Sequence, residues 1–487
     1  MTSTTPGLAE PAPEPTPRPR SGGPHVVVVG GGPGGYEAAL VARRSGARVS
    51  LVERSGVGGA AVLTDVVPSK TLIATAEWMT IADRAPELGI RTAGLPTDGP
   101  ARGHQVLLDE VNARVRRLAE AQSQDIRTRL ENEGVDVIEG TGRLDGPERV
   151  VVAADERERT LDADVVLVAT GATPRVLPEA QPDGERILTW TQLYHLDRLP
   201  ERLVVVGSGV TGAEFAGAYR SLGSDVVLVS SRERVLPGED ADAAQVIEDV
   251  FTDRGMTVLS RSRAASARRT ADGVAVTLSD GRVVEGSHCL MAVGSVPSTA
   301  GIGLEEAGVH LGPGGHVEVD RVSRTSARGV YAAGDCTGVL PLASVAAMQG
   351  RIAMAHALGD AVQPLDLSEV AANIFTAPEI ATVGRSQRAL DEAGVRYVTS
   401  TLALARNPRA KMLGMKDGFV KLFAHAATGT VLGGVVVAPR AGELIFPLTI
   451  AVSHRLTSDD VARSFTVYPS LSGSIAEVAR VLHAREP

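Results

Sequence analysis

The chain of 487 residues has only two cysteines, Cys289 and Cys336. Two cysteines cannot build a disulfide framework, and their wide separation matches no metal-ligand spacing, so we predict no metal site. Free cysteine commonly packs as a small apolar side chain, and we interpret both thiols as buried and inert. This usage favours a reducing, cytoplasmic compartment.

The sequence also lacks a long apolar run and an excess of positive charge. No stretch approaches the ~20 apolar residues that cross a bilayer, which predicts no integral membrane span. The formal net charge is -9, and we expect no nucleic-acid partner because such binding needs a concentrated basic surface. Residues 1–24 are rich in proline and lack a basic start before an apolar core. We predict a disordered tail there, not a secretory signal.

A dinucleotide-binding pattern begins directly after this tail. Residues 25–29 are a run of His and Val that is typical of a strand buried on both faces, and a helical segment follows at 36–42. The loop between them predicts a tight turn, an approach to a pyrophosphate and close helix packing, through Gly30, Gly32, Pro33, Gly34 and Gly35. A second predicted strand, 48–53, ends in Glu53, at the spacing of a carboxylate that binds a ribose diol.

The same pattern occurs a second time in the chain. A strand at 202–206 leads into a second fingerprint, formed by Gly207, Gly209, Val210 and Gly212. Two complete patterns, each in its own strand–loop–helix setting, are far more specific than one. The next strand, 225–229, ends in Ser230, Ser231 and Arg232 where an NAD-preferring domain carries an acid. We predict that NADPH is accepted, with Arg232 or Arg234 pairing with its 2′-phosphate; arginines that merely face solvent are the alternative.

The stretch Gly58–Lys70 lies between the two patterns and resembles a redox-active segment. It keeps Gly58, Gly59, Pro68, Ser69 and Lys70, but it has Ala61 and Val66 where flavin-dependent disulfide reductases carry a pair of reactive cysteines. With both fingerprints and the C-terminal segments around 375–380 and 418–421, the chain resembles the FAD-dependent pyridine nucleotide-disulfide oxidoreductases from His25 onward. Within them it is most similar to the lipoamide dehydrogenase-like NAD(P)H:quinone reductases of actinobacteria, which lack the redox disulfide.

This resemblance implies a set of site residues. Lys70 matches the family lysine beside the flavin, and Glu214 matches the glutamate that pairs with it. The other implied FAD contacts are Gly58, Gly59, Ala60, Gly142, Ala169, Thr170, Gly171, Asp335, Leu342 and Ala343. Gly294 is implied at the NAD(P) site.

The C-terminal segment departs from the family in a related way. Disulfide-reducing members end in a histidine and a glutamate that act across the dimer interface, and this chain has Tyr468 and Gly473 at those positions. The thiols, the base and its orienting acid are therefore lost together. We expect Tyr468 and Ser470 to line a space for a planar acceptor, and we expect a homodimer through the C-terminal domain.

The predicted fold is α/β, with two Rossmann-like domains for FAD and NAD(P) and a C-terminal α+β dimerisation domain. The expected domains are a tail at 1–24, the FAD domain at 25–175 and 295–366, the NAD(P) domain at 176–294 and the interface domain at 367–487. The predicted function is hydride transfer from NAD(P)H to FAD and onward to a quinone, without lipoamide dehydrogenase activity. Soluble pyridine nucleotide transhydrogenation and a flavin redox sensor without turnover are the alternatives.

Overall fold

A five-stranded parallel sheet forms the first unit of the molecule. The computed structural model describes residues 23–90, 105–154 and 157–483. The strand order is β18-β7-β1-β2-β3, with β1 (His25–Val29), β2 (Arg48–Glu53), β3 (Asp136–Glu139), β7 (Val165–Val168) and β18 (Val330–Ala332). The predicted strands at 25–29 and 48–53 are confirmed. Residues 1–22 of the predicted tail lie outside the described residues, whereas Pro24 already accepts a 2.9 Å hydrogen bond from Arg48 N–H.

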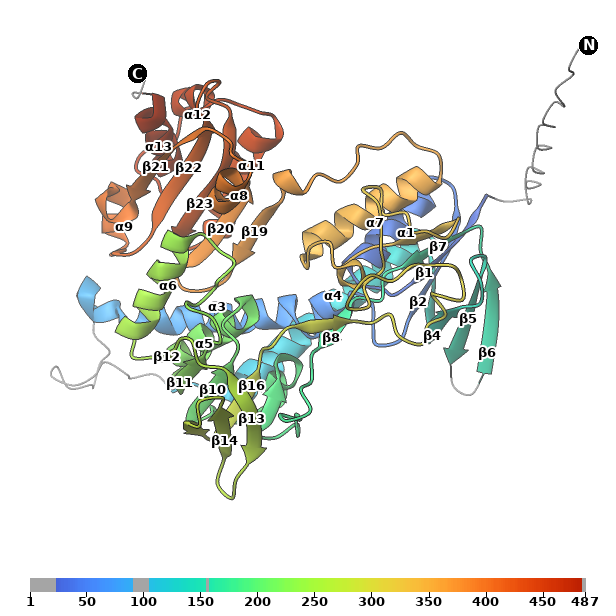
Figure 1. The fold of residues 1–487 in the computed structure, drawn as a ribbon, viewed down its shortest axis with the longest axis horizontal. Coiled ribbons are helices and arrows are strands. Elements are labelled where there is room, and N and C mark those ends of the chain that lie inside the picture. The colour runs from blue at the N-terminus through green and yellow to red at the C-terminus, as the bar shows by residue number, and fades with distance from the viewer. Residues whose placement is uncertain (1–22, 91–104, 155–156, 484–487) are drawn as a thin grey trace, which may run out of the picture.

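Both faces of this sheet are covered, as its apolar strands require. Helix α1 (Pro33–Arg44) packs beside helix α7 (Ala343–Ala357) on one face (Figure 1). On the other face lies an antiparallel meander of β4 (Thr141–Leu144), β5 (Arg149–Ala154) and β6 (Arg157–Asp162). Strand β18 enters the sheet from a segment far along the chain, so the first unit is completed only after the second has been traversed.

The second unit repeats the parallel arrangement. Its strand order is β12-β11-β10-β16-β9, with β9 (Ile187–Thr189), β10 (Arg202–Val206), β11 (Asp225–Val229), β12 (Thr257–Leu259) and β16 (His288–Met291). Helices α5 (Val210–Leu222) and α6 (Ala241–Asp253) accompany it, as does an antiparallel meander of β13 (Ala264–Arg269), β14 (Val274–Leu278) and β15 (Val283–Gly286). A two-stranded ribbon, β8 (Ala172–Pro174) with β17 (Ser295–Pro297), connects the first two units.

The C-terminal unit is an antiparallel sheet with short helices. Its order is β19-β20-β23-β22-β21, with β19 (Ala371–Ile374), β20 (Glu379–Gly384), β21 (Tyr397–Ala403), β22 (Phe419–His425) and β23 (Val431–Ala438). Its helices are α8 (Gln387–Glu392), α9 (Pro408–Met412), α10 (Ala441–Leu444), α11 (Phe446–Ser453), α12 (Ser458–Arg463) and α13 (Gly473–His483). The predicted α/β fold class with a C-terminal α+β domain is confirmed.

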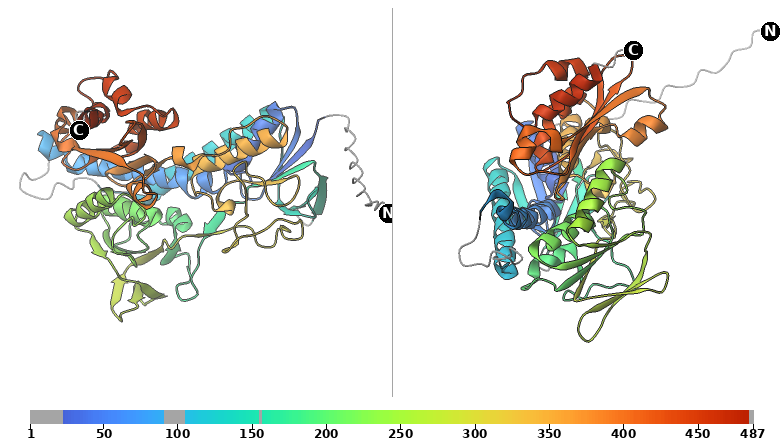
Figure 2. Two further views of the ribbon diagram at one scale, coloured as in Figure 1. Left: turned by 45° about the horizontal axis from the view of Figure 1, so that its top comes forward. Right: turned by 90° about the vertical axis from the view of Figure 1, so that its left-hand side faces the viewer.

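Two long helices hold the three units together. Short α2 (Gly59–Leu63) leads into α3 (Val66–Asp83), and α4 (Leu108–Asn132) lies beside α3 (Figures 1 and 2). One apolar core contains Leu72 of α3, Phe215 of α5 and Phe419 of β22. The start of α3 is therefore fixed relative to both other units. In the described parts of the chain, no helix combines the length and apolar character needed to cross a membrane.

Candidate active site

The two glycine-rich loops have the same local geometry. A Cβ atom built on Gly35 would lie 1.9 Å from the Gly30 carbonyl oxygen, and one on Gly212 would lie 1.8 Å from that of Gly207. Only glycine permits these helices to approach their strands so closely. Gly32 and Gly209 are the N-caps of α1 and α5, and a Cβ on either would meet no atom within 4 Å. Open space thus lies at both helix N-termini, where a phosphate is favoured.

The surroundings of the first loop fit FAD. Glu53 accepts 2.7 Å hydrogen bonds from Gly31 N–H and Ser55 N–H, one on each carboxylate oxygen. Each oxygen keeps a lone pair that can accept a bond from a ribose hydroxyl. Among the described residues, the buried Thr170 hydroxyl has no nitrogen or oxygen partner and meets only the weakly bonding Cys336 thiol, although buried polar groups are nearly always satisfied. A polar ligand in the open space would supply the missing oxygen or nitrogen partner.

The other predicted FAD contacts surround the same region. Gly142 of β4 packs on Val29, where a Cβ would lie 3.0 Å from a Val29 methyl. Leu342 is the N-cap of α7 and Ala343 its first residue. Pro33 begins α1, Gly34 faces Ala333, and Ala169 and Gly171 flank Thr170 beyond β7. The elements thus bring residues from four distant parts of the sequence to one edge of the first sheet.

Asp335 lies in the segment that returns to the first sheet. It begins a short 3-10 helix, η3 (Asp335–Thr337), which is separated from the end of β18 by two residues. Burial raises the pKa of its carboxyl, and the positive charge of His316 opposes that shift. A cavity of about 540 Å³ adjoins this helix and is lined in part by His316, Thr337 and Gly338.

The stretch Gly58–Lys70 lies directly against the first loop. Gly58 N–H donates a 2.8 Å hydrogen bond to the Gly31 carbonyl, and a Cβ on Gly59 would lie 2.9 Å from Gly32 Cα. Ala60 and Ala61 are in α2, and Val66 is the first residue of α3. The two cysteines of the chain are elsewhere and buried, and burial raises the pKa of Cys289 to about 12 and that of Cys336 to about 11. Neither thiol is poised for exchange chemistry.

An ion pair joins the two nucleotide-binding units. Lys70 Nζ donates a 2.6 Å hydrogen bond to Glu214 Oε2, and Glu214 is only 3% exposed. The second carboxylate oxygen of Glu214 accepts a 2.8 Å bond from Phe375 N–H. Lys70 Nζ also lies 5.0 Å from the centroid of the Phe375 ring. The start of α3 therefore carries a fixed cation that is held by residues from both other units.

Ser230, one of the residues predicted to contact NAD(P), has a structural role in the second loop. The Ser230 side chain is fully buried, and its hydroxyl lies 2.6 Å from that of Ser208. It also accepts a 3.1 Å bond from Arg232 N–H, so it fastens the glycine loop to the end of β11. Ser230 is a poor candidate for a direct nucleotide contact because its hydroxyl is buried and already bonded to Ser208 and Arg232.

The neighbouring residues of the second loop remain available. The side chains of Ser231 and Arg232 are exposed at the end of β11. Glu233 instead forms an ion pair with Arg261. Val210 begins α5 and is 43% exposed, and Gly294 follows β16. Among the described residues, neither exposed Arg232 nor half-buried Arg234 forms an ion pair, so both predicted cations of this segment stay available to a phosphate, and Arg232 is the more exposed of the two.

Tyr468 and Ser470 lie in the C-terminal unit. Tyr468 is 83% exposed, whereas the Ser470 hydroxyl accepts bonds from Gly473 N–H at 3.0 Å and Ser472 Oγ at 3.2 Å. The Ser470 side chain therefore organises the turn before α13. Among the described residues, no hydrogen bond or ion pair joins this segment to Lys70 or Glu214 of the same chain.

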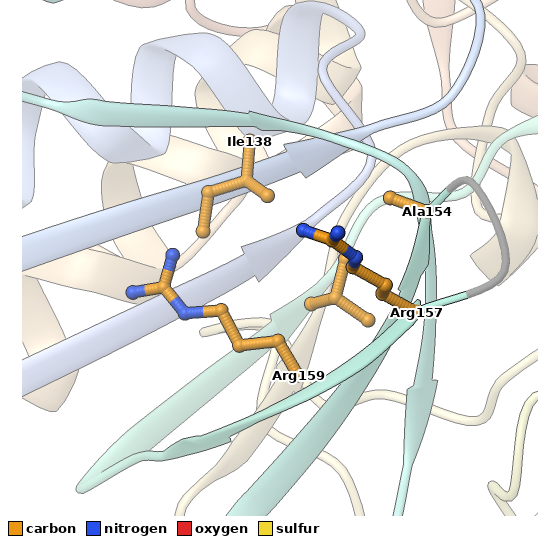
Figure 3. Close-up of a pocket in the computed structure, with 5 residues that line it drawn as sticks. Ile138, Ala154, Arg157 and Arg159 are labelled. Atoms are coloured by element: carbon orange, nitrogen blue, oxygen red, sulfur yellow. The ribbon is translucent and has the colours of Figure 1, made fainter.

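A cavity of about 450 Å³ lies at the outer edge of the first unit. Figure 3 shows Arg157 and Arg159 of β6 directed over Ile138 of β3. Ile138 pairs with Val52, the residue before Glu53. This cavity belongs to the open edge between β3 and the meander and contains no member of the Lys70–Glu214 pair.

Three residues of the site were not identified from the sequence. Phe375 contacts both members of the ion pair, Asp65 precedes Val66 at the start of α3, and Tyr194 lies in the 3-10 helix η2 (Trp190–His195). A signal existed for Asp65 alone, since it is an acid inside the stretch that replaces the redox segment. Phe375 and Tyr194 are placed by tertiary contacts that no local pattern reveals.

Two family profiles match the chain. Residues 24–350 match the family described as pyridine nucleotide-disulphide oxidoreductase. Residues 370–479 match the dimerisation domain of the same family. Together they span both glycine loops, the Gly58–Lys70 stretch and the C-terminal sheet.

Individual relatives share most of their length with this chain. An NAD(P)H dehydrogenase (quinone) of Mycobacterium tuberculosis is 55% identical over 95% of this chain and 94% of the relative. A dihydrolipoyl dehydrogenase of Chlorobaculum parvum is 34% identical over 93% of this chain and 96% of its own. Among solved structures, LpdA from Mycobacterium tuberculosis has a TM-score of 0.89 and covers 94% of this chain and 99% of its own.

Proposed function

The chain belongs to the pyridine nucleotide-disulphide oxidoreductase family, and from this premise we propose that it is an FAD-dependent NAD(P)H dehydrogenase that reduces a quinone. The 55% identity to an enzyme of that name over nearly the whole chain supports this reaction. The observation that carries it is the combination in the Gly58–Lys70 stretch: the Lys70–Glu214 pair is in place, while the thiol positions hold Ala61 and Val66.

The family uses FAD and NAD(P)H, and both open helix N-termini fit these ligands. Bound FAD would supply the chemistry of the reaction, by accepting a hydride from NAD(P)H and passing two electrons to the acceptor. Lys70 supplies a fixed positive charge at the start of α3, and Glu214 orients it. Asp335 and Glu53 offer carboxylates to hydroxyl groups of the dinucleotide. Arg232 offers a guanidinium to a 2′-phosphate.

The acceptor has no thiol to react with in this chain's site. A planar quinone meets that condition because it accepts two electrons without forming a bond to sulfur. The dimerisation domain supports a homodimer, and we propose that the exposed Tyr468 of a second copy closes the acceptor space. Ser470 positions that segment through its turn before α13. We also propose the domain limits 25–175 with 295–366, 176–294 and 367–487, and the scarcity of cysteine supports a cytoplasmic location.

Transhydrogenation between nicotinamide nucleotides is the second candidate. It is favoured by the end of β11, where Ser231 and Arg232 include no carboxylate that would exclude NADPH. A mixture of NADPH and an oxidised NAD analogue distinguishes the two reactions. Hydride exchange as fast as quinone reduction would favour the transhydrogenase, and exchange that is far slower would favour the quinone reductase.

Rapid mixing tests the proposed function. FAD-loaded protein is reduced by NADPH without oxygen and then mixed with menadione or with lipoamide. We expect fast reduction, fast reoxidation by menadione and no reoxidation by lipoamide. Absence of reduction would instead favour a redox sensor without turnover, and reoxidation by lipoamide would overturn the proposal.

A further inference from the structure

Asp65 is a carboxylate at the start of α3 that the helix does not use. It occupies the N-cap position, but its side chain makes no capping hydrogen bond. An N-cap aspartate normally accepts a bond from the second or third helical N–H. Only the backbone of Asp65 is engaged, with its N–H on the Ala60 carbonyl and its carbonyl on Ser69 N–H, both at 2.8 Å. The carboxyl is therefore free for another role.

Charged groups from α3 itself and from two other elements face this carboxyl. Burial raises the pKa of Asp65 to about 6, the Lys70 ammonium opposes the shift, and the negative charges of Glu214 and Asp335 add to it. Lys70 belongs to α3, Glu214 to α5 and Asp335 to η3, so the cluster stands where the first and second units meet. Asp65 also lies between Ala61 and Val66, the two positions that carry thiols in disulfide reductases.

A second observation points to a bound group beside Asp65. Tyr194 is 3% exposed, and among the described residues its hydroxyl makes no hydrogen bond of ordinary geometry, with only the Ser69 hydroxyl close enough to interact with it. Burial and the charge of Asp65 hold the pKa of this phenol well above its usual range, so it stays a neutral donor. The Ser69 hydroxyl donates its own proton to the Val66 carbonyl at 3.3 Å, so toward the phenol it can act only as an acceptor. The Tyr219 hydroxyl, also in this neighbourhood, is buried and unpartnered. Such hydroxyls are ordinarily satisfied by an ordered water.

Reduction of a quinone requires a proton in addition to the hydride. NAD(P)H supplies both electrons and one hydrogen, and the hydroquinone needs a second hydrogen. Glu214 is a poor source because both of its oxygens accept hydrogen bonds, from Lys70 and from Phe375 N–H. Asp65 is the carboxyl beside the site whose side chain has no structural task.

We propose that Asp65 delivers this proton to the reduced acceptor and that Tyr194 holds the carboxyl in place through an ordered water. The O–H bond of the Asp65 carboxylic acid breaks as the second O–H bond of the hydroquinone forms. The resulting carboxylate then takes up a proton from solvent. This inference rests on the proposed function, since it assumes a quinone-type acceptor.

The test uses FAD-loaded Asp65→Asn, Asp65→Glu and Tyr194→Phe proteins, with Asp83→Asn at the other end of α3 as the matched control. Rapid mixing separates flavin reduction by NADPH from reoxidation by menadione across pH 5 to 8. We expect Asp65→Asn to slow reoxidation roughly 100-fold and flavin reduction less than twofold. The parent and Asp65→Glu should show a reoxidation rate that falls as pH rises through the carboxyl's titration. Tyr194→Phe should move that midpoint to higher pH, because a donor that favours the carboxylate is lost.

Infrared titration gives a readout that is independent of turnover. The parent and the Asp83→Asn protein should show a protonated carboxyl band that disappears near pH 6, and Asp65→Asn should lack it. If Asp65→Asn keeps the parent's reoxidation rate and pH profile while menadione is still reduced, the assignment to Asp65 is wrong and the proposed function stands. If the parent reduces no quinone, the proposed function and this inference both fail.

Discussion

Lys70 Nζ lies 2.6 Å from Glu214 Oε2, and this contact joins α3 to α5, the helix that follows the second nucleotide loop. Glu214 is almost fully buried, whereas Lys70 is 24% exposed. A buried carboxylate is stable only when it is paired and hydrogen-bonded, and here Lys70 and Phe375 N–H satisfy it. The pair fixes a cation at the end of the Gly58–Lys70 stretch.

Neutralising Glu214 should slow the hydride step. In Glu214→Gln the ammonium of Lys70 loses its charged partner, and a hydrogen bond to a charged group contributes about 1.5–3 kcal/mol. We expect the rate of flavin reduction by NADPH, measured by rapid mixing, to fall roughly 10- to 100-fold with FAD still bound. Glu87→Gln, in an exposed pair with Arg84, serves as the control and should change the rate less than twofold. An unchanged rate in Glu214→Gln would remove the pair from the mechanism.

Arg232 should determine the use of NADPH. Its side chain is exposed beside the second loop, whereas Arg261 is paired with Glu233. We expect Arg232→Ala to lower kcat/KM for NADPH about 10-fold or more and to leave kcat/KM for NADH nearly unchanged. Arg261→Ala is the matched control and should affect both nucleotides equally. A parallel loss for both in Arg232→Ala would contradict recognition of the 2′-phosphate.

Much of this arrangement could be predicted from the sequence because its signals are local. The strands at 25–29 and 202–206, and the glycines that follow them, depend on side-chain pattern and on space for a Cβ, both of which are read from neighbouring residues. The likeness of the chain to its family also located Lys70 and Glu214, which the structure places in contact. Their roles in the reaction stay predictions.

The remaining features depend on which elements meet in space. Ser230 follows β11 at the position of a ribose ligand, yet its hydroxyl is buried against Ser208 of the neighbouring loop. Nothing in the local sequence distinguishes Tyr194 from an ordinary core aromatic. Its buried hydroxyl bears on the site only because η2 packs near Asp65. Phe375 binds Glu214 through its backbone N–H, a contact that the residue type cannot predict.

Lys421 should hold the second unit to the C-terminal sheet. Its Nζ lies 2.9 Å from Asp240, the N-cap of α6, and 2.8 Å from Asp242. Asp240 is 4% exposed, so Lys421→Met leaves a buried carboxylate without a counter-ion. We expect the free energy of unfolding of the FAD-loaded protein to fall by about 3–5 kcal/mol, measured in urea. Asp242→Asn removes a partner that is 64% exposed and should cost less than about 1 kcal/mol. Equal losses of unfolding free energy in both variants would contradict a stabilising role for the buried Lys421–Asp240 pair.

The Asp65 carboxyl should make folding stability depend on pH. Its pKa is raised from 3.8 to about 6 by burial, so the folded state binds a proton more tightly than the unfolded chain. The stabilisation that this tighter proton binding gives the folded state is fully present below pH 3.8 and is lost as pH rises through 6. At neutral pH, Asp65→Asn should therefore be more stable than the parent by at most about 3 kcal/mol, measured by thermal unfolding. A difference that does not grow between pH 4 and 7 would contradict the raised pKa.

The most direct test of thiol-free acceptor reduction is NADPH oxidation by the FAD-loaded protein before and after treatment with a thiol-alkylating reagent. Cys289 and Cys336 are buried, and the Gly58–Lys70 stretch has no cysteine. We predict turnover with menadione that alkylation leaves unchanged, and no turnover with lipoamide. Turnover with lipoamide, or loss of menadione turnover upon alkylation of the folded protein, would contradict the account.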